Sequence, residues 1–389
     1  SYLRIDRIIS AAEMTDSEAI HPGYGFLAEN AHFAEVCRDC HIEFIGPSPE
    51  AMSLLGDKIN CKKLARAAGT PVFPGTDGEI EEIEEAVEIA SEIGYPVIVK
   101  ATAGGGGKGM RIAHNVAALR TAVTAAQQEA IASFGNGAVY LEKFLDQARH
   151  VEVQVLGDKH GNAVHLFNRD CTSQRRHQKL IEEGPAPGVN TEIRDRVCES
   201  AAELIRQAEY SGAATVEFLM NEKQEFFMLE VNTRVQVEHP VSEMITGVDI
   251  VKESIRVAAG EPLSWTQDQI TLNGHAIECR INAEDPSNNF MPQPGTIETW
   301  QLPGGPGIRI ETHVRPGYRI PPNYDSMIGK LIVHGRDRNE AISRMRSALS
   351  EMKVAPIATT IPLHQRLLNH HAFVSHDFDI NWVERLLEE

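Results

Sequence analysis

The chain has 389 residues, enough for two or three domains, and its 42% hydrophobic and 24% charged content is that of a globular protein. Acidic residues outnumber basic ones by 55 to 37, and the net charge of −18 argues against general binding to nucleic acid or to an anionic membrane. No apolar run approaches the roughly 18 residues that a membrane-spanning helix needs.

The six cysteines are scattered along a long chain, so they do not predict a disulfide framework. Cys37 and Cys40 have C-x-x-C spacing, but they lie in an amphipathic helical stretch with no second pair, and neither a redox nor a zinc role is expected. We therefore predict a reducing compartment, which is the cytoplasm or, in a eukaryote, the mitochondrial matrix or the plastid.

Helices and short strands alternate at the start of the chain, and this alternation predicts a parallel sheet. Ser48 and Pro49 mark the start of the following helical stretch, and Gly69 marks its end. The expected elements are a helix near 3–14, a strand at 19–20, a helix near 28–39, a strand at 42–46 and helical segments over 47–68.

Residues 71–145 have the pattern of a small α/β unit, and the rest of the chain that of a larger, strand-rich unit. The strands expected in the small unit lie near 71–73, 95–101, 110–113 and 138–141, and its helices near 80–93 and 115–132. The helices expected in the large unit lie near 190–211, 241–260, 338–352 and 362–370.

A strand that carries Lys100 leads into four consecutive glycines at 104–107. Glycine lets backbone amides approach an anion closely, so a glycine run between two strands predicts a cover over phosphates. A dinucleotide site is not expected because a second strand, MRIAH, follows the loop. No Ser or Thr follows Lys108, which excludes a Walker A motif, and the D-F-G and H-R-D motifs of protein kinases are absent. A plain flexible hairpin is the alternative.

Two further segments suggest nucleotide and anion binding. VYLEKFL, at 139–145, ends a strand and leads into the large unit as a hinge whose backbone can receive a purine edge. Residues 168–187 gather cationic side chains in an acidic protein, which predicts an anion pocket, with a solvated loop as the alternative. These side chains are Arg169, Arg175, Arg176, His177 and Lys179.

EFFMLEVNTRVQVEH, at 225–239, is an apolar strand that runs into polar residues and keeps a two-residue period. The strand is therefore expected to continue to Glu238 with its polar side chains on one face. Two carboxylates, a carboxamide and a guanidinium on one face suit a divalent cation beside an oxyanion. An edge strand with a solvated face is the alternative. The polar face consists of Glu230, Asn232, Arg234, Gln236 and Glu238.

ATVEFLM, at 214–220, is expected to pair antiparallel with this strand through a turn at 221–224. That pairing places Glu217 opposite Met228 and one diagonal step from Glu230. A carboxylate among Val, Phe and Leu is costly to bury unless a cation meets it. Glu217, Glu230 and Asn232 form an all-oxygen set, which suits magnesium or manganese and argues against zinc.

In order and spacing, these segments resemble the ATP-grasp enzymes and, among them, the biotin carboxylases, which carboxylate biotin within biotin-dependent carboxylases. The resemblance covers essentially the whole chain. Its motifs are HPGYGFLAEN at 21–30, RDCTSQRRHQK at 169–179, EVNTRVQVEHPVSEMITGVDIV at 230–251, GHAIECRINAEDP at 274–286 and PPNYDSMIGKLI at 321–332.

The resemblance implies the ATP-grasp fold, a mixed α/β and α+β architecture. The family has a further βαβ stretch before the point at which this sequence starts, and a homodimer is expected when that segment is present. The expected domains are a partial N-terminal pre-ATP-grasp domain over 1–46, a helical linker over 47–70, a lid over 71–144 and a C-terminal ATP-grasp and biotin carboxylase domain over 145–389.

The resemblance also implies roles for individual residues. Glu238 would be the general base for bicarbonate, and Arg309 would lie beside bicarbonate and steady the biotin enolate. Bicarbonate would bind Lys179, Arg234, Gln236, Val237 through its backbone, and Glu238; metal would bind Glu217, Glu230 and Asn232. The residues implied for ATP are Lys58, Lys100, Gly106, Gly107, Glu142, Lys143, Phe144, Leu145, His150, Gln174, His177 and Leu219.

The implied reaction uses ATP, magnesium or manganese, and bicarbonate to carboxylate biotin through carboxyphosphate. The biotin would arrive on a biotin carboxyl carrier protein or domain, and a carboxyltransferase would pass the carboxyl group on, in acetyl-CoA carboxylase of fatty acid biosynthesis. Propionyl-CoA, methylcrotonyl-CoA and pyruvate carboxylases are alternatives for the parent enzyme. An ATP-grasp ligase that makes carbamoyl phosphate or a carboxylated purine, and a nucleotide-binding scaffold without activity, are alternatives for the function.

Overall fold

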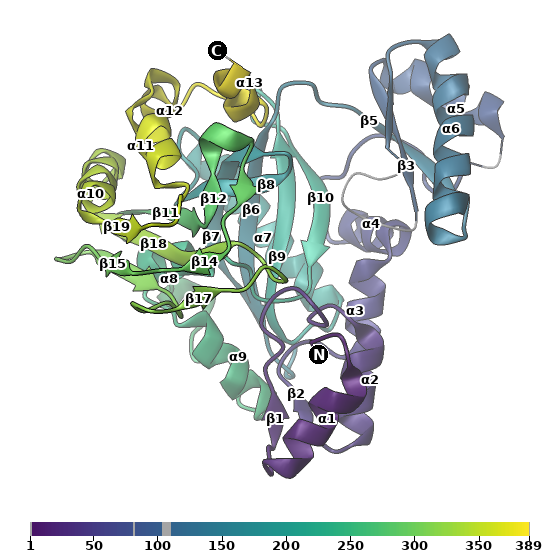
Figure 1. The fold of residues 1–389 in the computed structure, drawn as a ribbon. Helices are drawn as coiled ribbons and strands as arrows, with labels where there is room; N and C mark the ends of the chain where they lie inside the picture. Colours follow the sequence, from purple (N-terminus) through teal and green to yellow (C-terminus); the bar gives the residue numbers. More distant parts are fainter. Residues whose placement is uncertain (1, 81, 103–109, 389) are drawn as a thin grey trace.

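The computed structural model describes residues 2–80, 82–102 and 110–388 (Figure 1). Within these ranges, eight strands form one antiparallel sheet at the centre of the molecule, in the order β10-β9-β6-β7-β8-β11-β18-β16. The strands are β6 (Arg149–Gly157), β7 (Ala163–Arg175), β8 (Gln178–Gly184), β9 (Gly212–Met220), β10 (Phe226–Asn232), β11 (His275–Asn282), β16 (Ile308–Glu311) and β18 (Met327–Gly335).

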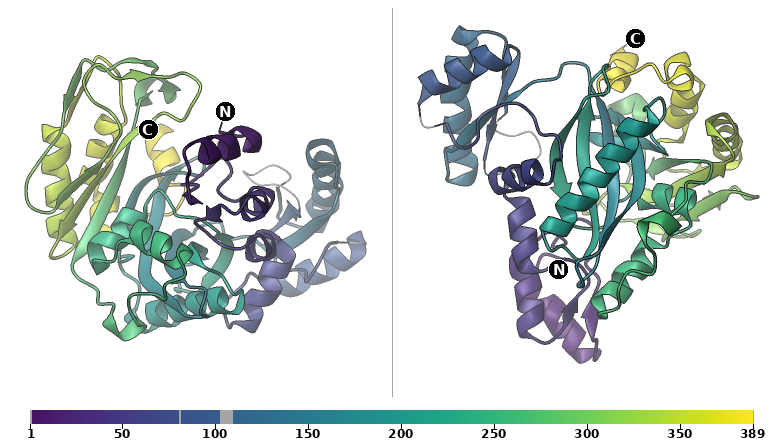
Figure 2. Two further views of the ribbon diagram at one scale, coloured as in Figure 1. Left: turned by 90° about the horizontal axis from the view of Figure 1, so that it is seen from below. Right: turned by 180° about the vertical axis from the view of Figure 1, so that it is seen from behind.

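The two faces of this sheet differ in chemistry. One face is apolar and packs against α7 (Thr191–Gln207) and α10 (Arg338–Glu351) through two large clusters of buried side chains. The view from behind shows α7 lying across the strands (Figure 2). The other face carries charged residues toward α8 (His239–Thr246), because side chains alternate along each strand.

The remaining C-terminal elements surround the sheet. The helices are α9 (Ile250–Ala258), α11 (Ile361–Asn369), α12 (His371–Ser375) and α13 (Trp382–Glu388), with the 3₁₀ turns η1 (Gln267–Gln269) and η2 (Pro286–Asn288). The short strands are β12 (Glu284–Asp285), β13 (Met291–Pro292), β14 (Gly295–Thr296), β15 (Thr299–Gln301), β17 (Arg319–Ile320) and β19 (Lys353–Ala355).

The N-terminal elements confirm the predicted alternation of helix and strand. The two short strands pair in parallel. Asn30, Ser48 and Asp57 each cap the helix that begins at the following residue, by accepting hydrogen bonds from its backbone N–H groups. The elements are α1 (Ile5–Met14), β1 (Ala19–Ile20), α2 (Ala31–Asp39), β2 (Glu43–Phe44), α3 (Pro49–Gly56) and α4 (Lys58–Ala67).

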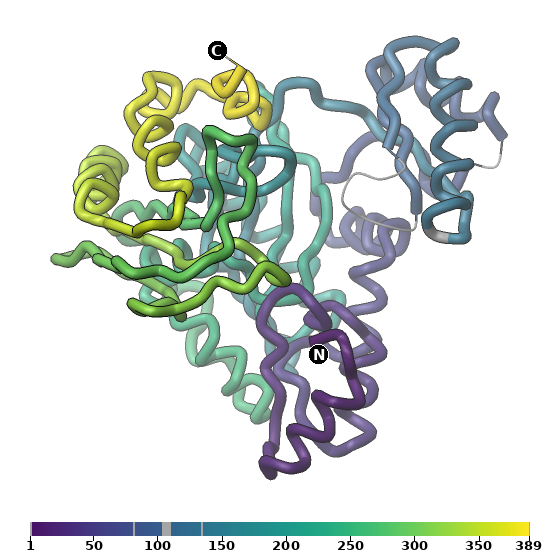
Figure 3. Tube along the Cα trace, in the orientation of Figure 1, coloured from purple at the N-terminus to yellow at the C-terminus, as the bar shows by residue number. Residues whose placement is uncertain are grey.

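A small unit with its own hydrophobic core stands apart from the large sheet, on the side opposite the C-terminal helices (Figure 3). Its strands pair antiparallel in the order β4-β3-β5. Gly106 and Gly107, predicted to contact ATP, lie outside the described residues. The elements are α5 (Ile83–Ile93), β3 (Val97–Ala101), β4 (Arg111–Ala113), α6 (Val116–Phe134) and β5 (Val139–Lys143).

Three details of the predicted elements are wrong. The strand expected at 71–73 is only a single bridge from Val72 to Met228. The helix expected over 241–260 is split into α8 and α9 at Gly247, whose φ of 75° is the left-handed conformation that ends many helices. The strand expected to continue to Glu238 ends at Asn232. The domain boundaries stay predictions. Among the described helices, none combines the length and the apolar character that a membrane span requires.

Candidate active site

Lys179 lies at the centre of a cluster of charges on the polar face of the sheet. Its Nζ donates to Glu152 Oε2 at 2.5 Å, to Glu217 Oε1 at 2.9 Å and to Glu238 Oε1 at 2.6 Å. Burial opposes its charge, but these three carboxylates raise the pKa of Lys179 well above its usual value. Lys179 therefore joins the predicted metal residue Glu217 to the predicted base Glu238.

Glu217 is closer to Glu230 in register than the sequence predicted. The expected pairing of Glu217 with Met228 is wrong, because a register shift between Met228 and Glu230 on β10 places Glu230 directly opposite Glu217. Glu217 Oε1 also accepts from Asn232 Nδ2 at 3.0 Å. The three predicted metal residues are thus neighbours on the β9–β10 pair.

These residues fit a divalent cation. The Glu230 side chain is exposed, yet its pKa is raised, first by the loss of hydration within the surrounding protein and then by repulsion from the Glu217 carboxylate. Burial opposes ionisation of Glu217, but Lys179 and His150 hold its pKa below its usual value. A hard cation between the two carboxylates would relieve their repulsion, and Asn232 adds a neutral oxygen.

Residues 233–238 follow the end of β10 and form a turn. Their polar side chains are brought together by hydrogen bonds and not by the alternation of a strand. Arg234 Nη2 donates to Asn232 Oδ1 at 3.0 Å, and its Nη1 donates to Gln236 Oε1 at 3.1 Å. Gln236 Nε2 in turn donates to Glu217 Oε1 at 3.1 Å. Glu29, in the N-terminal HPGYGFLAEN motif, accepts from Arg234 Nε at 2.8 Å and so holds the turn in place. The predicted bicarbonate residues are brought together in this way.

Glu238 is fully buried between two cations. Beside its contact with Lys179, its Oε2 accepts from Arg280 Nη2 at 2.9 Å, and Arg280 Nε donates to Glu182 Oε1 at 2.5 Å. Burial disfavours the carboxylate, but Lys179, Arg280 and Arg169 hold the pKa of Glu238 well below its usual value. Arg280 was missed as a site residue, although it stands as a cation in the apolar strand of the GHAIECRINAEDP motif.

Arg309 lies apart from Glu238. Its guanidinium pairs with Glu243 at 2.7 Å and with Glu311. Glu311 also pairs with Lys330 at 2.6 Å, and Lys330 Nζ donates to the carbonyl oxygen of Val237 at 2.7 Å. Arg309 is therefore linked to the bicarbonate turn through two ion pairs, and its predicted contact with bicarbonate and biotin stays a prediction.

The cation-rich segment does not form one pocket. Arg169 is fully buried on β7, where its Nε donates to Glu152 Oε1 at 2.6 Å. The Arg175 guanidinium stacks on the Phe290 ring at 4.0 Å, and His177 is exposed at the β7–β8 turn. Of these predicted cations, Lys179 alone reaches Glu238 in the contacts of the described residues.

Three predicted nucleotide residues meet beside Glu217. His150 pairs with Leu219 across β6 and β9, and its Nδ1 lies 3.3 Å from Gln174 Nε2. Burial opposes the charge on His150, but Glu217, 2.9 Å from Nε2, raises its pKa. The Glu217 carboxylate therefore favours the protonated form of this imidazole beside the metal residues.

The small unit and α4 contribute a second group of charges. Glu142, buried on β5, pairs with Lys100 at 2.5 Å and also with Lys62. The pKa of Lys58 is lowered, chiefly by burial and then by Lys100, while Glu230 and Glu142 oppose this shift. Lys58 therefore lies within electrostatic reach of both groups of charges. Cations outnumber carboxylates around Glu142, as an anion site requires.

The predicted adenine hinge already makes hydrogen bonds and ion pairs with neighbouring residues of the small unit and α4. The Glu142 side chain is occupied by its two lysines, and Lys143 Nζ donates to the carbonyl oxygen of Gly94 at 3.0 Å. The backbone N–H groups of Lys143 and Phe144 donate to Pro74 and Pro96. An adenine at this segment would have to use other backbone groups near Leu145.

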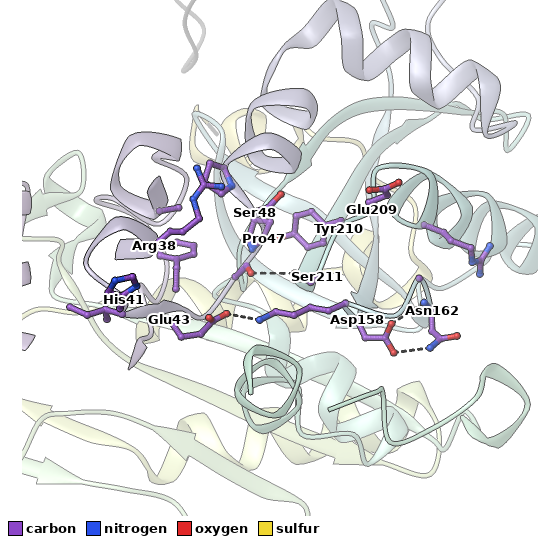
Figure 4. Close-up of a pocket in the computed structure, with 18 of the residues that line it drawn as sticks. Arg38, His41, Glu43, Pro47, Ser48, Asp158, Asn162, Glu209, Tyr210 and Ser211 are labelled. Atoms are coloured by element: carbon purple, nitrogen blue, oxygen red, sulfur yellow. Dashed lines mark hydrogen bonds and ion pairs between the residues drawn. The ribbon is translucent and has the colours of Figure 1, made fainter. Parts of the chain in front are cut away.

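A cavity of about 870 Å³ lies elsewhere, between the N-terminal elements and the β6–β7 turn (Figure 4). Arg38, Glu43, Lys159 and Tyr210 line it, and Lys159 pairs with Glu43 at 2.6 Å. None of the predicted site residues in the described part of the chain lines this cavity. The candidate active site is therefore the cluster of charges around Lys179 on the sheet, and not this cavity.

Comparison with known proteins identifies the family of this chain. Residues 1–52 match the family model "Biotin carboxylase, N-terminal domain", 57–266 match "Carbamoyl-phosphate synthase L chain, ATP binding domain" and 278–385 match "Biotin carboxylase C-terminal domain". Over 385 residues the chain is 52% identical to biotin carboxylase 1 of Bacillus subtilis, covering 99% of this chain and 86% of that protein.

Two further relatives come from larger carboxylases. A pyruvate carboxylase subunit of Methanothermobacter thermautotrophicus is 51% identical over 384 residues, covering 99% of this chain and 78% of that protein. The biotin carboxylase domain dimer of 2-oxoglutarate carboxylase from Hydrogenobacter thermophilus, solved with MgADP, ADP and bicarbonate, has a TM-score of 0.91 at 48% identity, covering 99% of this chain and 85% of that chain. The predicted family and fold are confirmed: the chain belongs to the biotin carboxylases and is an ATP-dependent ligase that carboxylates biotin.

Proposed function

We propose that the residues around Lys179 carry out the first half-reaction of a biotin-dependent carboxylase, in which bicarbonate is activated by ATP and its carboxyl group passes to biotin. The observation that supports this most directly is the position of Lys179, which contacts Glu217 and Glu238 at once. One cation thereby joins the proposed metal and nucleotide side of the site to the proposed bicarbonate side.

Bicarbonate would bind between Lys179, Arg234, Gln236, the backbone of Val237 and Glu238. Glu238 would take the proton of bicarbonate, and the freed oxygen would attack the γ-phosphorus of ATP, so that ADP leaves and carboxyphosphate forms. As an anion between Lys179 and Arg280, Glu238 becomes a stronger base only when bicarbonate draws one of these cations away.

Glu217, Glu230 and Asn232 would hold the magnesium or manganese ions. When bound, such ions neutralise the charge that develops on the transferring phosphoryl group. Lys58 and Lys100 would meet the phosphates, with the glycines that include Gly106 and Gly107. The other nucleotide contacts proposed are His150, Gln174, His177, Leu219 and the segment Glu142, Lys143, Phe144 and Leu145.

Carboxyphosphate would break into carbon dioxide and phosphate, and the phosphate would take the ureido proton of biotin. The resulting enolate would attack carbon dioxide, which forms carboxybiotin and balances the reaction. We assign the stabilisation of the enolate to Arg280, because Arg280 contacts Glu238 directly and Arg309 does not in the contacts of the described residues.

We propose that the biotin arrives on a biotin carboxyl carrier protein or domain and that a carboxyltransferase transfers the carboxyl group to acetyl-CoA, in fatty acid biosynthesis. The Bacillus relative, named as a biotin carboxylase in its own right, supports a separate subunit. The pyruvate carboxylase relative, at 51% identity, supports pyruvate as the second candidate acceptor. A homodimer is proposed on the precedent of the Hydrogenobacter domain. The described cysteines are all free, which fits a reducing compartment such as the cytoplasm, mitochondrial matrix or plastid.

The reaction is tested with radiolabelled bicarbonate, ATP, magnesium and free biotin, followed by transfer to a carrier protein. Bicarbonate-dependent ATP cleavage with label on biotin is expected. Label on ammonia-derived or purine products, or none on biotin, would contradict the proposal. Addition of a carboxyltransferase with acetyl-CoA or pyruvate then decides the acceptor, because only one of these should remove the label from biotin.

A further inference from the structure

Three buried acids surround Arg280 on the polar face of the sheet. Glu182, Glu238 and Glu278 are each fully buried. Glu182 on β8 and Glu278 on β11 stand directly opposite each other in register, so their side chains are neighbours on one face. Glu278 and Arg280 lie two residues apart on β11 and share that face, and Lys330 on β18 stands opposite Arg280.

Arg280 divides its contacts between two of these acids. Its Nε donates to Glu182 and its Nη2 donates to Glu238, so the guanidinium is held at one edge while its end reaches the proposed base. Both oxygens of Glu278 lack a hydrogen-bond partner among the described residues. Lys330, a cation on the neighbouring strand β18, is occupied by Glu311 and the carbonyl oxygen of Val237.

A fully buried carboxylate without a partner is less stable than the neutral acid, which needs no counter-ion. Burial accordingly raises the pKa of Glu278 well above its usual value; Lys330 and Arg280 oppose this, and Glu182 and Glu238 add to it. Burial also raises the pKa of Glu182 to about 7, with Arg280 opposing. The charged and titratable groups that act on this pair are Lys179, Glu238, Arg280, Lys330, Tyr24, Cys171 and Cys279.

We propose that Glu278 is a positioning residue that leaves Arg280 directed at Glu238 and the biotin enolate only while its own carboxyl group is protonated. The proposal rests on the proposed function, in which Arg280 serves biotin carboxylation. With Glu278 neutral, two carboxylates share the guanidinium. An ionised Glu278 is a third carboxylate on the same face, and it draws the guanidinium away from Glu238. Loss of this one proton therefore turns off biotin carboxylation on the alkaline side.

The pH dependence of biotin carboxylation tests this in full-length protein. We measure kcat between about pH 6 and about pH 10 for the wild type and for Glu278→Gln, which resembles the protonated acid at every pH. The expected result is an alkaline decline in the wild type that moves to higher pH in Glu278→Gln. Glu253→Gln, a matched loss of a buried acid on α9 that accepts from Ser264, should keep the wild-type profile. Identical alkaline limbs in the wild type and Glu278→Gln would overturn the proposal.

A second measurement does not depend on activity. The folded protein keeps Glu278 protonated while the unfolded chain ionises it near its ordinary pKa of 4.5, so this residue lowers stability progressively as pH rises above that value. The melting temperature of Glu278→Gln should therefore gain on the wild type from acid to alkaline pH. Infrared spectra at neutral pH should show a carboxylic acid carbonyl band that Glu278→Gln lacks.

These outcomes separate the two proposals. A wild type without biotin carboxylation at any pH would overturn the proposed function, and the infrared band would still decide whether Glu278 is protonated. An active wild type without that band, or with a melting-temperature difference that does not vary with pH, would overturn the role of Glu278 alone.

Discussion

The small unit with α4 and the central sheet carry opposite excesses of charge. Where α4 meets the small unit, Lys62 and Lys100 share the single carboxylate of Glu142. On the sheet, Lys179 is shared by three carboxylates, and Arg280 by two. A surplus of cations attracts phosphates, whereas a surplus of carboxylates attracts metal ions and protons. The two regions would therefore supply complementary halves of the proposed phosphoryl-transfer site.

The largest effect is expected at the centre of the sheet cluster. Glu238→Gln should lower bicarbonate-dependent ATP cleavage by about 100-fold or more, the usual contribution of a general base. The affinity for ATP, measured by calorimetry, should barely change, because Glu238 acts on bicarbonate and not on the nucleotide. Near-normal turnover in this variant would remove Glu238 from the role of base.

A comparison of two arginines sharpens the assignment of biotin. Arg280→Ala should lower carboxylation of free biotin by about 100-fold, while the slow biotin-independent ATPase falls less. Arg309→Ala is the matched control, since it removes a guanidinium that pairs with Glu243 and Glu311 instead of Glu238. A larger loss in Arg309→Ala than in Arg280→Ala would return the role to Arg309.

The small unit should be sensitive to the loss of Glu142, its one buried acid among the described residues. Glu142→Gln leaves Lys62 and Lys100 without their carboxylate and should destabilise this unit by about 3–5 kcal/mol at neutral pH. Burial opposes ionisation of Glu142, but Lys100 and Lys62 lower its pKa, so its stabilising effect is present above the ordinary value of 4.5 and is lost as pH falls through the folded pKa. Urea unfolding should show a difference between variant and wild type that shrinks in acid; a constant difference would argue against the ion pairs as its cause.

The smallest effect is expected at the metal residues. Glu230→Gln removes one of two opposed carboxylates and should raise the magnesium concentration for half-maximal activity by about 10-fold, while Glu217 remains. A titration of activity with magnesium measures the shift. An unchanged titration would exclude Glu230 as a ligand.

Local patterns predicted most helices, because hydrophobic period and capping residues are encoded within a few positions. The family and the fold were predicted from the resemblance of longer motifs to the biotin carboxylases. Geometry that depends on contacts between residues far apart in the sequence was harder to predict. The register shift on β10 that aligns Glu230 with Glu217 leaves no mark in the two-residue period. The strand end at Asn232 was missed because a turn of alternating polar and apolar residues has the same pattern as a strand. Arg280 became a candidate only when β8 and β11 brought Glu182 beside it.

Arg169 has a consequence for how this site can change over generations. It is fully buried, and it donates to Glu152, Gln154 and Ser242, so β6, β7 and α8 depend on one guanidinium. Replacing any one of these four residues leaves a charge or a polar group without a partner inside the protein. Single substitutions along any mutational path are therefore penalised before a compensating change can occur. We expect a substitution in this group to be tolerated only when a second member of the group changes with it.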